Sequence, residues 1–267
     1  MRTVPRHLVV AIALVAGVFV FGAFFPQNRS EAPPELSSGH LSKTFFDEAY
    51  EAVDPEKQVF AMSALSAHHL LIPNKIAELF ETIGSSSVRH VVILSPNHFG
   101  TGKHPVQTTD ADWQTPYGAL RTDDAVIARV RSVTGAALET QTFRNEHGVS
   151  ALTPFIKRSF PNAELIPLII HDSLTEEESK TLGEQIVNLY PRAVVIASAD
   201  MSHYQSAHVA AYHDEVTMQA LQAGGCNGCE LEVDANSVLR VLFSVNRARA
   251  TEEWNKSNLV YSLGMLV

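Results

Sequence analysis

The chain has 267 residues, of which 45% are hydrophobic, and its formal net charge is −9. This length suits one sizeable α/β domain with a real core. The body of the chain contains no basic run, which argues against a nucleic-acid-binding protein, because such proteins need a cationic footprint. The 12 histidines are the feature of the composition that most suggests a metal site.

The first residues have the pattern of a targeting or membrane segment. Arg2 and Arg6 precede an uninterrupted apolar run over residues 8–25. Residues 1–27 are therefore predicted to be a secretory signal peptide or a transmembrane anchor. We favour an uncleaved anchor. In both cases we expect the body to lie outside the cytoplasm, as a secreted protein if the segment is cleaved.

Residues 28–44 are rich in Pro, Ser, Glu and Gly and show no periodicity, which predicts a flexible linker. The folded domain is then expected over residues 45–267. Its two cysteines, Cys226 and Cys229, form a lone CxxC, which can be a redox pair, half a zinc site or two thiols in a loop. Outside the cytoplasm they could also form a local disulfide.

Strands and helices alternate along this domain. Short apolar runs bounded by turn residues predict strands over residues 59–66, 91–95, 164–170, 193–197 and 259–267. Apolar residues at helical spacing predict helices over residues 73–83, 124–132, 149–160, 175–189, 207–223 and 236–246. Residues 101–121 are expected to form a long irregular loop. The alternation predicts an α/β fold, a single domain with a largely parallel central sheet flanked by helices.

Three of the predicted strands lead to residues that can bind a metal. The first leads to His68 and His69, the second to His98, and the strand over residues 193–197 to Asp200 and His203. In open α/β sheets, ligands bind outside the carboxyl ends of the strands. Imidazole and carboxylate ligands with open positions suit Fe(II), Zn or Cu(II). The sequence therefore predicts a metal or acid–base site at this edge of the sheet.

Other polar residues allow a structural interpretation beside a functional one. Glu146 and His147 form an acid–base pair before a helix, or else supply the charge and cap of its first turn. Asp234 lies just before a helix and is expected to be its N-cap. His213 shares an apolar stripe with residues 209 and 216 and is expected to be a core histidine.

These segments together resemble motifs of the MEMO-like family, known in prokaryotes as protein B of the AmmeMemoRadiSam system. The family's Gly-Pro-Asn-His-x-Gly resembles Ser95-Pro96-Asn97-His98-Phe99-Gly100, and its Ser-Ser-Asp-x-Ser-His-Tyr resembles Ser198-Ala199-Asp200-Met201-Ser202-His203-Tyr204. Its Pro-His segment before the first helix resembles Ala67-His68-His69, and its Glu-His-Ser-x-Glu followed by Pro-Phe resembles Glu146-His147-Gly148-Val149-Ser150 followed by Pro154-Phe155. The resemblance covers residues 58–267.

The MEMO-like family is similar in fold to class III extradiol dioxygenases, which use non-haem iron. The resemblance therefore implies an extradiol-dioxygenase (LigB)-like fold. It makes His68, His98 and His203 the metal-site candidates, with Asp200 beside them. The chain departs from the family at Ser150, where the motif has an acid, and at Asp234, where the family often has a cysteine. A carboxylate in place of a thiolate would make the site harder and more suited to iron.

The expected function is that of a metal-dependent redox enzyme of dioxygenase-like type acting on a small organic substrate. Fe(II) is the expected metal, with Zn or Cu as alternatives, and Asp200, Glu146 and His147 are the expected acid–base or orienting groups. One alternative is a non-redox metal-dependent hydrolase, in which the metal lowers the pKa of bound water. The other is a non-catalytic binding module that retains the pocket. The membrane is an expected partner through the N-terminal segment, and nucleic acid is not.

Overall fold

The computed structural model describes residues 34–40, 42–51, 53, 59–225 and 230–249, together with the backbone of residues 259–262. The predicted membrane segment and the pair Cys226 and Cys229 lie outside the described residues. Within the described part of the chain, no helix combines the length and apolarity needed to cross a bilayer.

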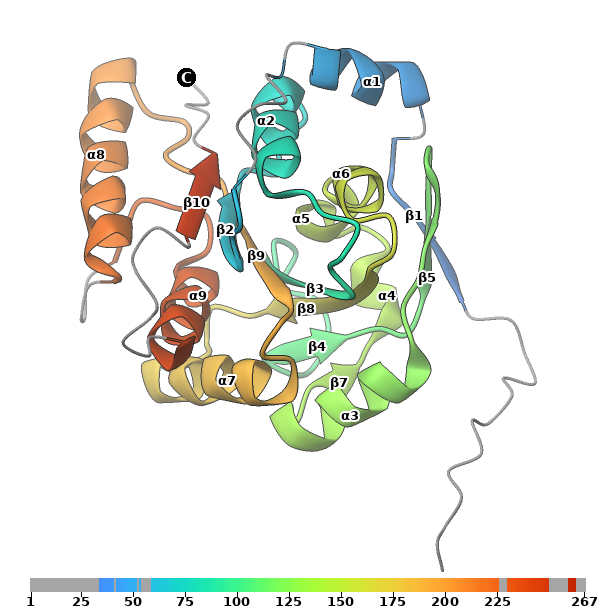
Figure 1. Cartoon of the computed structure of the whole chain (residues 1–267). Helices are drawn as coiled ribbons and strands as arrows, with labels where there is room; N and C mark the ends of the chain where they lie inside the picture. Colours follow the sequence, from blue (N-terminus) through green and yellow to red (C-terminus); the bar gives the residue numbers. More distant parts are fainter. Residues whose placement is uncertain are drawn as a thin grey trace, which may run out of the picture. The chain divides into compact units, whose positions relative to one another are not determined.

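A seven-stranded sheet forms the centre of the fold (Figure 1). Its strands are β2 (Ser63–Ser66), β3 (His90–Pro96), β4 (Val106–Thr108), β7 (Ala137–Leu138), β8 (Glu164–Ile170), β9 (Val194–Ser198) and β10 (Leu259–Ser262). They lie in the order β10-β2-β9-β3-β8-β4-β7. Every neighbouring pair is parallel except β4 with β8. The prediction of an α/β fold with a largely parallel sheet is confirmed.

The three strands that lead to the predicted site are neighbours in this sheet. β9 lies between β2 and β3, and it pairs Ser198 with Ser66 and Ala197 with Leu94. β9 is buried along its whole length, as is β3 from Val91 onward, which is expected for a parallel sheet covered on both faces. Because the three strands run in parallel and end at a similar level, the residues that follow them emerge at one edge.

Helices cover both faces of the sheet (Figure 1). Alternate residues of β3 belong to different cores, Val91 and Ile93 to one and Val92 and Leu94 to the other, as the two-residue period of a strand requires. The first core is covered by α1 (Lys43–Glu51), α2 (Pro73–Ile83) and α6 (Thr153–Ser159). The second is covered by α3 (Asp124–Thr134), α7 (Glu176–Leu189) and α9 (Asn236–Arg249). The remaining helices are the short α4 (Thr140–Phe143) and α5 (His147–Ser150), and the long α8 (Ala207–Ala223).

Two segments are more regular than the sequence predicts. The predicted linker over residues 28–44 contains β1 (Glu35–Ser37) and the start of α1, so ordered structure begins before residue 45. The predicted loop over residues 101–121 contains β4, β5 (Asp112–Thr115) and β6 (Gly118–Leu120). β1, β5 and β6 form a second sheet that buries Leu36 and Trp113. Strands of three or four residues are too short to show alternation in a sequence, and their pairing partners determine them.

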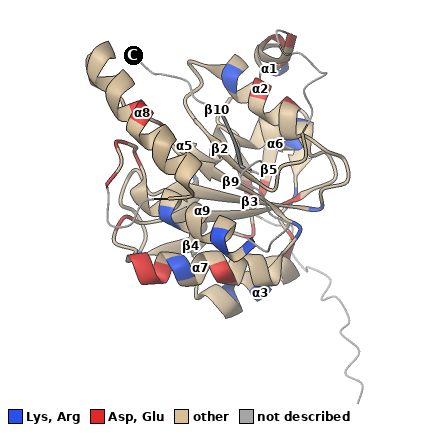
Figure 2. Cartoon of the chain, turned by 60° about the vertical axis from the view of Figure 1, so that its left-hand side comes forward, with Lys and Arg blue, Asp and Glu red and all other residues tan. Residues whose placement is uncertain are grey.

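The buried face of α8 also differs from the prediction. Residues Val209 and Val216 are 41% and 40% exposed, and His213 is half-buried, so the expectation of a core histidine is wrong. The helix instead buries Ala210, Asp214, Thr217, Ala220 and Leu221. Apolar residues occur nearly all round this helix, so an apolar stripe does not identify its inner face. Figure 2 shows α8 along the outside of the fold, with few charged residues, whereas Lys and Arg are spread over several other helices.

Candidate metal centre

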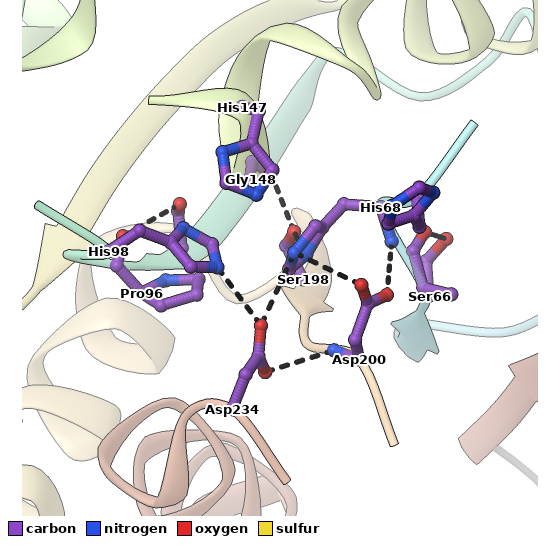
Figure 3. Close-up of polar contacts among 12 residues, drawn as sticks. Ser66, His68, Pro96, His98, His147, Gly148, Ser198, Asp200 and Asp234 are labelled. Atoms are coloured by element: carbon purple, nitrogen blue, oxygen red, sulfur yellow. Dashed lines mark hydrogen bonds and ion pairs between the residues drawn. The ribbon is translucent and has the colours of Figure 1, made fainter. Parts of the chain in front are cut away.

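Five side chains with metal-binding chemistry face one another at the carboxyl edge of the sheet (Figure 3). His68 follows β2, His98 follows β3 and Asp200 follows β9. His147 begins α5, and Asp234 lies two residues before the start of α9. The ligand atoms form two overlapping groups, each within 4.8 Å: His68 with His98 and His147, and His68 with Asp200 and Asp234.

His68 is held as a neutral imidazole with a free Nε2 atom. The Ser198 hydroxyl donates its single proton to the carbonyl oxygen of Gly148 at 2.6 Å, so it can only accept from His68 Nδ1, which lies 2.9 Å away. The side chain is almost fully buried. Burial lowers the pKa of His68 well below its usual value, and the charge of His98 lowers it further. The proton on Nδ1 leaves the lone pair of Nε2 facing the centre of the cluster.

His98 is clamped by the fully buried carboxylate of Glu146. That carboxylate accepts the backbone N–H of His98 at 3.0 Å, the ring Nδ1–H at 2.5 Å and the N–H of Gly148 at 2.9 Å. A side chain at Gly148 would collide with the hydroxyl of Ser95, so the glycine allows this close approach. Here too Nδ1 carries the proton, and Nε2 points to the shared centre. Carboxylate–histidine pairs of this kind orient metal-bound imidazoles.

Asp234 turns towards the histidines and does not cap α9 as the sequence predicted. Its Oδ1 accepts the backbone N–H of Asp200 at 2.9 Å, while its own N–H donates to the carbonyl of Asp200 at 3.2 Å. These two hydrogen bonds direct Oδ2 to His98 Nε2 at 3.1 Å and to His68 Nε2 at 3.2 Å. A single carboxylate oxygen therefore lies within hydrogen-bonding distance of the Nε2 atoms of both histidines.

Asp200 and His147 complete the cluster on either side. The Oδ1 atom of Asp200 accepts the backbone N–H of His68 at 3.0 Å, and its Oδ2 lies 3.5 Å from His68 Nε2. The His147 ring stacks on His98, with centroids 4.0 Å apart, and 46% of the His147 side chain is exposed. Burial, and then the charge of His98, lower the pKa of His147. His147 is therefore the cluster's solvent-accessible neutral base.

The charge of His98 depends on the same carboxylates. Desolvation alone would lower the pKa of His98, but hydrogen bonds to Asp234 and Glu146 and their charges outweigh it and raise the pKa to about 9. Without a metal, His98 is thus an imidazolium at neutral pH that donates to both carboxylates. A metal ion bound at Nε2 would have to displace that proton.

The donor atoms of the centre fit a cation. The lone pair of His68 Nε2 faces carboxylate oxygens of Asp234 at 3.2 Å and of Asp200 at 3.5 Å, and an ionised carboxylate donates no proton. Facing acceptors in a buried site are unfavourable unless a proton or a metal ion lies between them. Burial raises the pKa of Asp234, so a proton is one occupant. A divalent ion with imidazole and carboxylate ligands is the other.

The remaining predicted residues lie around this cluster. His203 belongs to neither group of facing ligand atoms, although it lies near enough for its charge to lower the pKa of His68. Its ring stacks on the exposed Tyr204. His69, the other candidate after β2, is exposed, and its Nδ1 accepts the N–H of Leu71.

The sequence reasoning missed one contributor to the centre and left the role of a second open. Ser198 fixes the tautomer of His68, but serine at a strand end gives no recognisable signal. Asp234 did have a signal, because it aligns with the site cysteine of the MEMO-like motifs, but its place just before a helix favoured a capping role.

Comparison with known proteins agrees with this resemblance. A family model described as "Memo-like protein" matches residues 23–236. The "MEMO1 family protein" of Thermotoga maritima is 23% identical over 210 residues, which cover 76% of each chain. That of Nitrosopumilus maritimus is 24% identical over 228 residues, which cover 84% of this chain and 78% of the relative.

A third relative is more similar over a shorter stretch. The "MEMO1 family protein" of Caldivirga maquilingensis is 31% identical over 119 residues, which cover 43% of this chain and only 42% of the relative. The family model, by contrast, matches well over half of the chain. The protein therefore belongs to the Memo-like protein family.

Proposed function

We propose that the protein is a metal-dependent redox enzyme that binds Fe(II) through His68, His98 and Asp234 and acts on a small organic substrate. One observation carries the proposal. The Nε2 atoms of both histidines lie 3.2 and 3.1 Å from the same oxygen, Oδ2 of Asp234. Two imidazoles and one carboxylate with open positions are the ligand set of non-haem Fe(II) oxygenases. The likeness of Memo-like proteins to extradiol dioxygenases in fold, expected from the sequence, points in the same direction.

The bound metal would act as a Lewis acid and as a one-electron redox centre for a substrate coordinated at its open positions. Glu146 holds the His98 ring in the orientation that presents Nε2. His147, neutral and half-exposed beside His98, would accept a proton from the substrate. The near-complete burial of His68 and Asp200 keeps bulk water from the inner side of the centre.

We keep Asp200 as an orienting group and His203 as an additional metal ligand in this proposal. The Asp200 carboxylate accepts a hydrogen bond from the backbone N–H of His68, and the Asp200 backbone N–H donates one to Asp234. Asp200 therefore helps to hold both of these ligands in place. His203 lies in the turn between β9 and α8, whose Ser202 N–H is held by the buried carboxylate of Asp214. A ligand on that turn could approach the centre when metal binds.

Elemental analysis after anaerobic purification tests the proposal. The wild-type protein should contain iron, and His68→Ala and Asp234→Asn should lose most of it. Glu139→Gln is the matched control, because its carboxylate makes an equally short 2.5 Å contact with His104 away from the cluster. Zinc with no iron or copper would overturn the redox assignment. Absence of any metal would overturn the site itself and favour a binding module.

We also propose that residues 1–27 attach the enzyme to a membrane, with the body on the extracytoplasmic side. The support is the apolar run over residues 8–25 behind two arginines. Alkaline carbonate extraction of membranes tests this attachment. A full-length protein recovered entirely in the cytoplasmic fraction would contradict it.

A further inference from the structure

A pocket of about 700 Å³ lies between the loop after β3 and the segment around α4. Its volume is within the range of small-molecule binding sites. Phe99 and Leu138 form apolar walls of the pocket, and they are 56% and 40% exposed. A ligand in this space would remove the exposed surface of both side chains from water, which favours binding of an apolar molecule.

The pocket borders the metal centre. Phe99 directly follows His98, and its ring centroid lies 6.2 Å from that of His147. Asn145, which also lines the pocket, directly precedes Glu146. A molecule that packs against Phe99 would therefore lie beside His147, the solvent-accessible neutral base of the centre.

The loop after β3 satisfies several of its polar groups within the protein. The Asn97 side chain accepts the backbone N–H of Thr101 at 3.1 Å and donates to the Thr101 carbonyl at 2.8 Å. The same carbonyl accepts a hydrogen bond from the buried Gln107 side chain at 2.9 Å. Gly102 lies so close to Gln107 and Glu139 that a side chain there would collide with both. The loop is therefore fixed in place, and a ligand does not have to order it.

The charges that line the pocket compensate each other. Among the described lining residues, the charged ones are Lys103 and Glu139. The Glu139 carboxylate accepts the backbone N–H of Lys103 at 2.9 and 3.1 Å and contacts the ring of His104. Burial alone would raise the pKa of Glu139, but hydrogen bonds from His104 and Lys103 and their positive charges outweigh it and lower the pKa. A charged ligand would lose hydration here without gaining an uncompensated partner.

We propose that the pocket binds the substrate as an uncharged molecule, held mainly by apolar contacts with Phe99 and Leu138. The inference rests on the proposed function for the role of the bound molecule as substrate. Gln141 and Asn145, both exposed, also line the pocket and can hydrogen-bond a polar group of the ligand. The substrate then becomes charged only when His147 accepts a proton from it beside the metal. The substrate class is thereby narrowed from small organic molecules to uncharged molecules with an apolar body.

Calorimetric titration with three probes that share one apolar body tests the inference: cyclohexylacetamide, cyclohexylacetate and 2-cyclohexylethylammonium. The full-length protein is first treated with a chelator, so that no probe is held by a metal ion. The wild-type protein should bind the amide about fivefold more tightly than either ion. Phe99→Ala and Leu138→Ala should each weaken binding of the amide about fivefold, because part of the apolar contact is lost.

Two further variants separate charge from apolar contact. Lys103→Met leaves the Glu139 carboxylate without the compensating charge, so it should raise the affinity for the ammonium relative to the acetate about threefold and leave that for the amide unchanged. Tyr212→Ala is the control for Phe99→Ala, because this ring on α8 is 69% exposed and does not line the pocket. It should change none of the three affinities.

Binding of either ion as tightly as the amide would overturn the assignment of an uncharged ligand. No binding of the amide, or an affinity for it that neither Phe99→Ala nor Leu138→Ala changes, would overturn the pocket. Metal content is measured separately on protein that has not been treated with chelator. Failure of the probe titrations with iron present refutes only the pocket, and the expected probe binding with no metal present refutes only the metal centre.

Discussion

Glu146 is the residue whose replacement reports most clearly on how the metal centre is built. It is fully buried and accepts three N–H donors, two from His98 and one from Gly148. Glu146→Gln keeps the shape but leaves one oxygen, because the second acceptor becomes an NH₂ donor. If the glutamine oxygen takes the place of Oε1, its NH₂ group takes the place of Oε2 and faces the backbone N–H of His98. Two buried donors then point at each other with no acceptor between them.

The magnitude follows from the contacts. An unsatisfied buried donor costs about 1–3 kcal/mol, and loss of a charge-assisted bond to His98 adds to this, so the metal-free protein should lose about 3 kcal/mol of unfolding free energy. Loss of a carboxylate that orients a metal-bound histidine typically lowers metal affinity ~10- to 100-fold. The pKa of His98 should also fall below its value of about 9, since one of the two carboxylates that raise it is removed.

Urea unfolding of the metal-free protein and chelator competition for the metal measure these effects. Glu139→Gln serves again as the control, since its partner His104 is 56% exposed in an otherwise similar pair. That control should lose less than about 1 kcal/mol and keep wild-type metal affinity. If Glu146→Gln matches the control in both measurements, the clamp on His98 does not position a ligand and the reasoning fails.

Four further predictions concern individual groups of the centre. Metal affinity should rise up to about tenfold per pH unit as pH increases towards 9, because the metal displaces a proton from His98. Potentiometric titration measures this dependence, and an affinity that stays constant from about pH 6.5 to about 9 would refute it. In the metal-free protein the raised pKa of His98 stabilises the fold fully below pH 6.5, and about 3 kcal/mol should be lost as pH rises through 9, as measured by urea unfolding. Ser198→Ala should lower metal affinity about tenfold, because the proton of His68 is then no longer held on Nδ1. Unchanged metal affinity would show that Ser198 does not determine the tautomer of His68. His203→Ala should reduce metal affinity less than Asp234→Asn does, and the reverse order would make His203 the better ligand.

The edge of the sheet where the site lies could be predicted from the sequence. Apolar runs followed by Ser-Pro-Asn-His98 and Ser-Ala-Asp200 mark strand ends, and parallel strands bring their ends together. The alternation of strands and helices determines that the sheet is parallel. Neither conclusion needs any knowledge of tertiary contacts, because both follow from local apolar patterns and turn chemistry.

The side chains that complete the centre depend on tertiary contacts and could not be predicted in this way. Asp234 comes from a loop before α9, and its direction is set by two hydrogen bonds to the backbone of Asp200, 34 residues away in the chain. The inner face of α8 includes Asp214, whose carboxylate accepts the N–H of Ser202, and an apolar stripe does not reveal such a contact. The strand β1 forms only because β5 provides its partner.

X-ray absorption at the metal edge of the anaerobically purified protein tests the central claim most directly. The account predicts a first shell of nitrogen and oxygen at about 2.0–2.2 Å, with the multiple scattering of at least two imidazole rings. His98→Ala should reduce this contribution by one ring. A first shell made only of oxygen, or one that contains sulfur, would contradict a centre built on His68, His98 and Asp234.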